Sequence, residues 1–389
     1  MEKDQKKPGN KSHNSLNAKQ SNHIASLVYL AIFFLFLPGL ACAQALNPPA
    51  IEVTKNRINV SVSWTPVSNA LGYRLLYAPY PFTGSDSIKT IDLSDQTELS
   101  VQLWDGATFY VAVNAYDGST SSKLSNVELF FLSAAPVLDA NALPVTGTNW
   151  YKPPVSVTWQ WQLLGEVNPD YDVELYDIDL FDSSVELIKS LQASGKKVIC
   201  YFSAGSYENF REDKDRFDPA TLGNLLDGWP DEQWLDIRST RVAEIMIERL
   251  NLAMQKGCDG VEPDNMDGYL NDSGFDLTAR DQLAFNKFIV NEAHKRGLSV
   301  GLKNDLDQIP ELVDFYDFSV NEQCHEFDEC NTLEPFVQAG KPVLNAEYLQ
   351  QYSDDANERE TLCTTANNAQ FSTLILPLDL DDSFRLSCF

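Results

Sequence analysis

The stretch KGCDGVEPDNMDGY, Lys256–Tyr269, places four carboxylates where an apolar segment ends. Because successive side chains of a strand point to opposite faces, Glu262 and Asp264 project to the same side. The glycines, the proline and the asparagine around them are typical of a chain that leaves a strand for a turn. The stretch therefore predicts a strand whose last inward-facing positions are acidic.

Seven other apolar segments have the same design, and longer segments with helical spacing lie between several of them. The eight segments are TWQWQL (158–163), YDVELYDIDLF (171–181), KKVICYFSAG (196–205), DGVEPDN (259–265), LSVGLKND (298–305), FSVNEQC (318–324), KPVLNAEY (341–348) and FSTLILPL (371–378). The helical segments, 183–195, 239–257 and 278–297, each end in a glycine that can stop a helix in a left-handed conformation. This alternation predicts an α/β fold, a (β/α)8 TIM barrel over residues 157–389. An open doubly wound sheet is the rival, but no glycine-rich phosphate loop follows the first strand.

The N-terminal part of the chain has a different pattern. Residues 46–133 contain short segments of alternating apolar side chains separated by Asn, Gly, Asp and Ser, which predicts a small all-β sandwich. The runs VSWTPVSNALGYRLLY (62–77) and FYVAVNAYD (109–117) resemble a fibronectin type III domain, which implies a spacer or an accessory binding role. Residues 134–156 contain four prolines and are predicted to be a linker.

The first 45 residues have the composition of an export signal. Five lysines precede the apolar run IASLVYLAIFFLFLPGLACAQA, which Pro38 and Gly39 interrupt before small residues that suit a signal peptidase. We expect cleavage after Ala43 or Ala45 and a secreted or periplasmic protein without membrane contact after cleavage. Two alternatives stay open, an uncleaved anchor helix and a lipid attached to Cys42.

The formal net charge of −27 at pH 7 argues against a nucleic-acid partner, since such proteins need basic surface. The charge suits solubility after export and is compatible with a cationic ligand. Nothing in the sequence indicates the oligomeric state.

The six cysteines after the signal can form disulfides in an oxidising compartment. Cys324–Cys330 and Cys363–Cys388 are the pairs expected from proximity in the chain. This leaves Cys200 and Cys258, for which buried thiols are one expectation, because the sequence alone cannot choose among the fifteen possible pairings. No CxxC pair is present, so zinc-ribbon and thioredoxin-like sites have no support.

The chemistry available to the strand ends is limited by the scarcity of histidine. Only His294 and His325 follow the signal; we expect the first to be exposed on a helix, whereas the second could line the rim. Two distant histidines support neither a zinc site nor a Ser-His-Asp triad, and we predict no metal or cofactor. Carboxylates suffice for glycoside hydrolysis, in which one protonates the leaving oxygen and the other attacks the anomeric carbon or activates water. A hydrolase that uses oxygen-ligated magnesium or calcium is the alternative.

The motifs of the C-terminal domain resemble glycoside hydrolase family 114, a family of TIM barrels that includes endo-α-1,4-polygalactosaminidases. The resemblance covers about Trp159 to Phe389 and rests on WQWQL (159–163), YDVELYDIDLFD (171–182), KVICYFSAGSYENFR (197–211), GWPDEQWLDIRS (228–239), GCDGVEPDNMDGY (257–269), GLKND (301–305), FSVNEQC (318–324) and NAEY (345–348). It implies a secreted glycoside hydrolase that cleaves α-1,4-galactosaminidic bonds in a cationic amino-sugar polysaccharide. A non-catalytic polysaccharide-binding protein on the same barrel is the alternative function.

The resemblance also implies roles for individual residues. The family's proposed catalytic Asp and Glu end the fourth and sixth strands and match Asp264 and Glu322, which implies a nucleophile and a general acid/base in a retaining mechanism. Candidate substrate contacts are Asp177, Asp179, Tyr201, Glu262, Lys303, Asp305, Glu347 and Tyr348. Four of these also allow a structural role: Asp179 can cap a helix, Lys303 can pair with a neighbouring carboxylate, Glu262 can orient another side chain, and Asp305 can close a turn.

Overall fold

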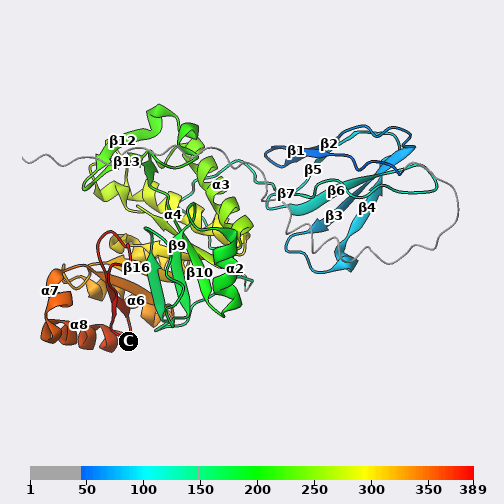
Figure 1. The fold of residues 1–389 in the computed structure, drawn as a ribbon. Coiled ribbons are helices and arrows are strands. Elements are labelled where there is room, and N and C mark those ends of the chain that lie inside the picture. The colour runs from blue at the N-terminus through cyan, green and yellow to red at the C-terminus, as the bar shows by residue number, and fades with distance from the viewer. Residues whose placement is uncertain (1–44, 148) are drawn as a thin grey trace, which may run out of the picture. The chain divides into compact units, whose positions relative to one another are not determined.

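The computed structural model describes residues 45–147 and 149–389, and the chain separates into two compact units between Ala134 and Ala135 (Figure 1). The predicted export signal, residues 1–45, lies outside the described residues except for its last position, and so does Cys42. None of the described helices is long and apolar enough to cross a bilayer.

The N-terminal unit is a β-sandwich, as predicted. Its two antiparallel sheets have the orders β1–β2–β5 and β4–β3–β6–β7. The strands are β1 (Ile51–Asn56), β2 (Asn59–Trp64), β3 (Gly72–Pro79), β4 (Lys89–Asp92), β5 (Glu98–Gln102), β6 (Thr108–Tyr116) and β7 (Glu128–Phe131). The rings of Trp64 and Tyr73 lie 5.7 Å apart in the core that alternating apolar side chains of both sheets form. The unit resembles fibronectin type III domains in this arrangement of three strands facing four.

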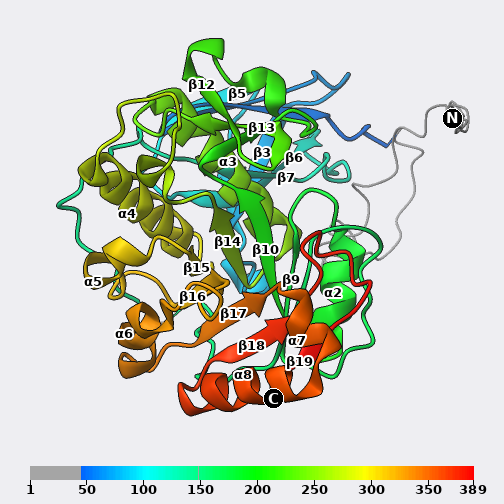
Figure 2. The same ribbon diagram turned by 90° about the vertical axis from the view of Figure 1, so that its left-hand side faces the viewer.

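The C-terminal unit is built on eight parallel strands that follow one another in chain order around a curled sheet (Figure 2). They are β8 (Trp159–Gln162), β9 (Leu175–Asp179), β10 (Lys197–Ser203), β14 (Gly260–Asp264), β15 (Ser299–Lys303), β16 (Phe318–Glu322), β17 (Val343–Glu347) and β18 (Ser372–Ile375). A short antiparallel strand, β19 (Leu386–Ser387), extends the sheet beside β18. All eight predicted strands are present, which confirms the (β/α)8 barrel class.

The barrel closes between β8 and β18 through side chains. In the described part of the chain no backbone ladder joins these two strands. Instead, the Trp159 indole N–H donates to the Ser372 carbonyl at 2.8 Å, and the Ser372 hydroxyl donates to the Val157 carbonyl at 2.7 Å. Trp159 and Trp161 stack with ring centroids 5.7 Å apart and belong to the buried apolar cluster inside the barrel. Large aromatic side chains thus fill the seam where the two ends of the sheet meet.

The three predicted helices are present as α2 (Val185–Ala193), α3 (Thr240–Lys256) and α4 (Ala279–Lys295). The glycines that follow them, Gly195, Gly257 and Gly297, have φ of 89°, 85° and 73°, so each helix ends in the expected left-handed conformation. The later connections carry α5 (Ile309–Leu312), α6 (Glu334–Gln338), α7 (Gln350–Asp354) and α8 (Ala356–Asn368). Single 3₁₀ turns occupy Ser85–Ser87, Lys214–Arg216, Pro219–Thr221, Gly268–Leu270, Leu306–Gln308 and Cys330–Leu333.

Between β10 and α3 the chain makes an excursion that the sequence pattern did not predict. It forms a separate antiparallel sheet, the excursion sheet, in the order β11 (Ser206–Glu208), β13 (Trp229–Leu235) and β12 (Leu222–Leu226). This sheet lies beyond the C-terminal end of β10, the end where the polar residues of the barrel gather (Figure 2).

The segment predicted as a linker contacts the barrel helices. The Trp150 ring stacks on His294 with centroids 4.1 Å apart, and its indole N–H donates to Asp317 at 2.9 Å. His294 is therefore buried and paired with Asp317 at 2.9 Å, so the expectation that it is exposed is wrong. The helix position was predicted correctly, but the stacking partner comes from outside the barrel motif.

Three disulfides are present. Cys324–Cys330 and Cys363–Cys388 confirm the pairs expected from proximity. Cys200 and Cys258 also form a disulfide, so the expectation of buried thiols is wrong. The reason is the barrel itself: Cys200 lies on β10, and Cys258 lies two positions before the start of β14, the strand that pairs with β10.

Candidate active site

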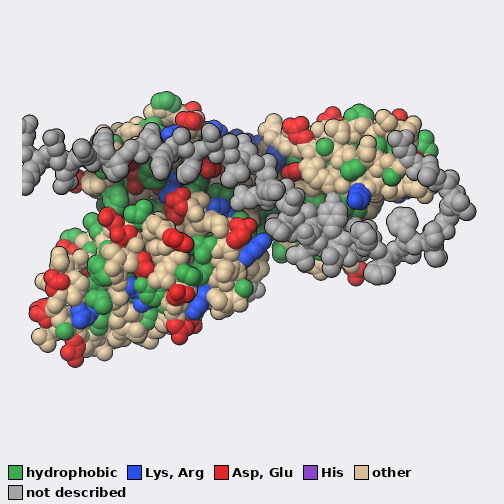
Figure 3. Space-filling view, in the orientation of Figure 1, with side chains coloured by type: hydrophobic (Ala, Val, Ile, Leu, Met, Phe, Trp, Pro, Cys, Tyr) green, Lys and Arg blue, Asp and Glu red, His purple; other side chains and the backbone are tan. Residues whose placement is uncertain are grey.

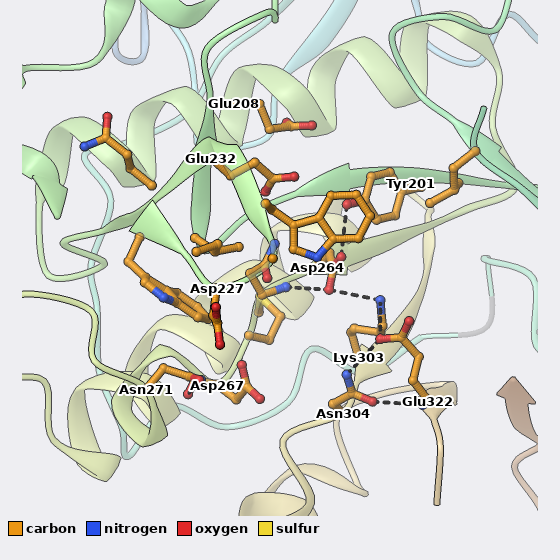
Figure 4. A pocket seen from close by; sticks show the side chains of 18 of the residues that line it. Tyr201, Glu208, Asp227, Glu232, Asp264, Asp267, Asn271, Lys303, Asn304 and Glu322 are labelled. Atoms are coloured by element: carbon orange, nitrogen blue, oxygen red, sulfur yellow. Dashed lines mark hydrogen bonds and ion pairs between the residues drawn. The ribbon is translucent and has the colours of Figure 1, made fainter. Parts of the chain in front are cut away.

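The C-terminal ends of the barrel strands open into a cleft of about 1570 Å³ (Figure 4). A cleft of this size exceeds the roughly 300–1,000 Å³ of ordinary small-molecule sites and suits a longer ligand. The sequence-predicted residues that line it are Asp179, Tyr201, Asp264, Lys303 and Glu322. The excursion sheet supplies much of the remaining wall, including Trp229 and Glu232.

Asp264 ends β14, and hydrogen bonds fix both of its carboxylate oxygens. The Tyr201 hydroxyl donates to Oδ2 at 2.9 Å, and the Asn265 backbone N–H donates to Oδ1 at 2.6 Å. Its own carbonyl accepts the backbone N–H of Gly205 at 3.0 Å. A Cβ at position 205 would lie 1.7 Å from the Asn265 carbonyl oxygen, so only glycine allows this approach. The loop after β10 thus holds the acidic end of β14 in place.

Glu322 ends β16 and is held from two sides. The Tyr348 hydroxyl donates to Oε1 at 2.6 Å, and the Asn304 side-chain amide donates to Oε2 at 3.2 Å. The Asn304 carbonyl oxygen also accepts the Glu322 backbone N–H at 3.0 Å, so one amide fixes both the backbone and the carboxylate. Asn304 adopts a left-handed conformation with φ of 48°, which is uncommon outside glycine and is often found at functional sites.

Lys303 lies between the two carboxylates and is almost fully buried, with 3% of its side chain exposed. Its ammonium nitrogen is 3.0 Å from Asp264 Oδ1, 3.4 Å from Glu322 Oε2 and 3.4 Å from Glu262 Oε1. Burial alone would lower the pKa of Lys303, but the negative charges of these three neighbours hold it well above its ordinary value. Lys303 is therefore a permanent cation that pairs with carboxylates and cannot serve as a base.

Asp177 and Glu262 form a second carboxylate pair beneath Lys303. Both are completely buried, and neither lines the cleft. Burial is the main cause that raises the pKa of Asp177 to about 7 and the pKa of Glu262 well above its ordinary value. The negative charge of either acid disfavours a charge on the other. Apart from the 3.4 Å contact of Glu262 with Lys303, their oxygens have no partner among the described residues.

Three more of the predicted substrate contacts, Asp305, Glu347 and Tyr348, do not line the cleft. Asp305 accepts from Asn286 on α4 at 2.7 Å, and Glu347 accepts the backbone N–H of His325 at 3.0 Å; both acids are buried outside the cleft lining. Burial raises the pKa of Asp305 to about 8 and that of Glu347 to about 7. Tyr348 is absent from the lining and reaches the site through its bond to Glu322.

Asp179 lines the cleft, but its carboxylate forms an ion pair with Arg211. The Arg211 guanidinium binds both of its oxygens, at 3.1 and 2.6 Å, and also donates to Glu208 at 2.7 Å. Arg249 reaches Glu208 at 3.3 Å from α3. Neither arginine was predicted from the sequence, because both lie outside the ends of the barrel strands. Four basic and acidic groups buried together nevertheless anchor the excursion sheet to the barrel.

The histidine and cysteines after β16 do not form a metal site. Cys324, His325 and Cys330 lie close together, but the two sulfur atoms form a disulfide and are not thiolate ligands. His325 is partly buried, and desolvation lowers its pKa. The short disulfide loop instead closes the chain directly after Glu322.

A glycoside hydrolase needs two carboxylates at the bond that it cleaves. Here the two carboxylates end the fourth and sixth strands of a parallel barrel, in a cleft large enough for a polymer. The fold and the site are therefore those of a glycoside hydrolase. The sequence profile of glycoside-hydrolase family GH114 matches residues 140–389, and the chain belongs to this family.

A solved structure agrees with this assignment. The chain is 45% identical to Aspergillus fumigatus Ega3, solved in complex with galactosamine, with a TM-score of 0.60 over 64% of this chain and 100% of that one. The glycoside hydrolase domain of PelA from Pseudomonas aeruginosa matches at 15% identity and a TM-score of 0.49, over 60% of this chain and 99% of that one. No match was found among curated protein sequences.

Proposed function

We propose that this glycoside hydrolase cleaves α-1,4-galactosaminidic bonds with Asp264 as nucleophile and Glu322 as general acid/base. The observation that carries the proposal is the convergence of both carboxylates on Lys303, at 3.0 and 3.4 Å. Lys303 therefore brings both carboxylates to one point of the cleft. A retaining mechanism, in which the second carboxylate attacks the anomeric carbon, is part of the proposal.

The hydrogen bonds of Glu322 indicate which oxygen carries the proton. Oε2 faces the Lys303 ammonium and the Asn304 amide, both of which only donate. The proton of the acid form therefore belongs on Oε1, beside the Tyr348 hydroxyl, which can donate or accept.

The reaction then has two balanced halves. In the first, Glu322 gives its proton to the glycosidic oxygen while Asp264 attacks the anomeric carbon, so the leaving sugar departs and a glycosyl ester forms on Asp264. In the second, the Glu322 carboxylate takes a proton from water as the water oxygen attacks the anomeric carbon and releases Asp264. Lys303 keeps its proton throughout and holds both acids in position.

The substrate class is supported by two observations. Ega3, the relative with 45% identity, was solved with galactosamine. The cleft of this chain is lined by several carboxylates, and negative charge of this kind favours a polycationic ligand. Acidic side chains are also spread over the surface of the barrel unit (Figure 3), so the charge of the cleft is one part of a generally acidic protein.

Secretion is supported by the three disulfides, since such bonds persist in oxidising compartments. The expected cleavage after Ala43 or Ala45 can be checked by sequencing the N-terminus of the mature protein.

The test is the release of reducing ends from partly deacetylated α-1,4-galactosamine polymer, with the anomeric configuration of the first product measured by NMR. We expect retention, and we expect Asp264→Asn and Glu322→Gln each to lower kcat by roughly 10²–10⁴-fold. Asp227→Asn, which removes an exposed carboxylate from the same cleft, is the matched control and should leave kcat unchanged. Binding of the polymer without new reducing ends, or full activity in both active-site variants, would refute the proposal.

A further inference from the structure

Glu232 is a carboxylate of the cleft that the proposed mechanism does not use. It lies on β13 of the excursion sheet and is partly buried. Figure 4 shows Glu232 and Asp264 facing the same pocket from different elements, and both line the cleft.

The hydrogen bonds around Glu232 all run toward it. The Ser206 hydroxyl donates to Glu232 Oε2 at 2.6 Å. Ser206 has only one hydroxyl proton, so the Ser203 hydroxyl, 2.5 Å away, must donate to Ser206. The Asn265 amide donates to the oxygens of both serines, at 2.9 and 3.2 Å. The network therefore directs one donor, the Ser206 hydroxyl, at Glu232 and holds its carboxylate as an acceptor.

Glu232 has no cationic partner within the described part of the chain. The Ser206 hydroxyl makes its one side-chain hydrogen bond there, and no ion pair involves it. The nearest positive influence is Arg211, which Asp179 and Glu208 already occupy at 2.6 and 2.7 Å.

The surroundings therefore disfavour a negative charge at this position. Burial, opposed by the Ser206 hydrogen bond and by Arg211 but reinforced by the charges of Glu208 and Asp264, raises the pKa of Glu232 to about 7. A carboxylate that is partly removed from water and lacks a counter-ion is stabilised by a ligand that brings a positive charge.

We propose that Glu232 is a specificity-determining residue that binds the protonated amino group of a sugar unit next to Asp264, so that the enzyme favours deacetylated galactosamine over N-acetylgalactosamine. The inference rests on the proposed function. An N-acetyl group is neutral and can offer Glu232 an N–H but no charge, so the discrimination comes from charge. The path from Asp264 through Asn265 and Ser206 to Glu232 ties this recognition to the position of the nucleophile.

The test compares wild type, Glu232→Gln and Asp379→Asn on fully deacetylated and fully N-acetylated α-1,4-galactosamine oligomers. Glutamine keeps the shape and the acceptor for Ser206. Asp379→Asn removes the same charge from an exposed position of the same cleft. Because a hydrogen bond to a charged group is worth more than a neutral one, Glu232→Gln should lower kcat/KM on the deacetylated oligomer about 10- to 100-fold, mainly through KM. Its kcat/KM on the acetylated oligomer, and both values for Asp379→Asn, should change by less than about threefold.

Binding of the two oligomers is measured by calorimetry alongside turnover. A wild type that hydrolyses neither oligomer refutes the proposed function, whereas the loss of deacetylated-oligomer binding in Glu232→Gln still decides the inference. An equal loss on both oligomers would mean that Glu232 only supports the structure of the cleft. An equal loss in Glu232→Gln and Asp379→Asn would mean that only the net charge matters. Either result overturns the inference.

Discussion

Two carboxylate pairs meet at Lys303, and they differ in almost every property. Asp264 and Glu322 are 18% and 27% exposed and accept hydrogen bonds from tyrosine and amide donors. Asp177 and Glu262 are 0% exposed and depend on each other and on Lys303. Glu262 and Asp264 belong to the same face of the same strand, two positions apart. Two positions along one face of a barrel strand thus lead from an acid buried in the barrel interior to an acid that lines the cleft.

The largest expected effect comes from removing the cation that both pairs share. Lys303→Met should lower the free energy of unfolding by about 3–5 kcal/mol, because carboxylates would stay behind in a buried site without their partner. It should also lower kcat by at least 100-fold, since both catalytic candidates lose an orienting bond. Chemical denaturation and steady-state kinetics measure the two effects.

Lys196→Met is the control for that experiment. Lys196 pairs at 3.5 Å with Asp172, whose side chain is fully exposed, so the loss should be at most about 1 kcal/mol. Equal destabilisation by the two variants would contradict the central position given to Lys303.

An intermediate effect concerns the pH dependence of stability. The pKa of Asp177 is about 7 in the folded protein, against about 4 in an unfolded chain. Between these pH values the folded protein keeps a proton that the unfolded chain has lost. Stability therefore falls as the pH rises from about 4 to about 7 and stays lower above that range. Asp177→Asn should make this fall shallower by roughly 2–4 kcal/mol.

The slope is measured by denaturant unfolding at several pH values. Asp305, with a pKa of about 8, acts in the same direction from another part of the barrel, so Asp305→Asn should reduce the slope up to pH 8 independently. An Asp177→Asn protein with the wild-type pH dependence would show that the buried pair does not hold the proton.

The smallest expected effect on kcat comes from removing the tyrosine hydroxyls that donate to Asp264 and Glu322. Tyr348→Phe removes the donor to Glu322 Oε1, and Tyr201→Phe removes the donor to Asp264 Oδ2. A hydrogen bond to a charged group contributes about 1.5–3 kcal/mol, so each variant should lower kcat roughly 10- to 100-fold and leave the carboxylate itself in place. A loss as large as that of Asp264→Asn would indicate that the tyrosine takes part in the chemistry directly.

The strand ends of the barrel were predictable because one signal repeats there. An apolar segment with polar side chains at its last inward positions, as in VEPDN and FSVNEQC, identifies both the strand and its end. The strands of the excursion sheet lack this signal. β13 begins with three exposed residues, Trp229, Pro230 and Asp231, and β12 contains a glycine and an exposed asparagine, so neither has a clear apolar face.

Contacts between distant segments were the other part that the sequence did not reveal. The burial of His294 depends on Trp150, and the Cys200–Cys258 disulfide depends on the pairing of β10 with β14. The alternation of side-chain directions along a strand predicts that Glu262 faces inward, but it does not predict how deeply the side chain is buried. Its change from substrate contact to buried partner of Asp177 follows from the layers of the closed barrel.

The seam between β8 and β18 has a consequence for folding. Trp159 and the backbone of Ser372 are 213 positions apart, and in the described chain no backbone ladder joins β8 to β18. That side of the ring is closed by side-chain hydrogen bonds and by the backbone N–H groups of Leu163 and Leu164, which donate to the Leu380 carbonyl. Closing so long a loop is entropically costly, so this join forms after the local strand–helix units. Until then the sheet has two open edges, which are the points where another chain can add a strand. The indole of Trp159 and the hydroxyl of Ser372 therefore help to cover two strand edges that would otherwise be open to another chain.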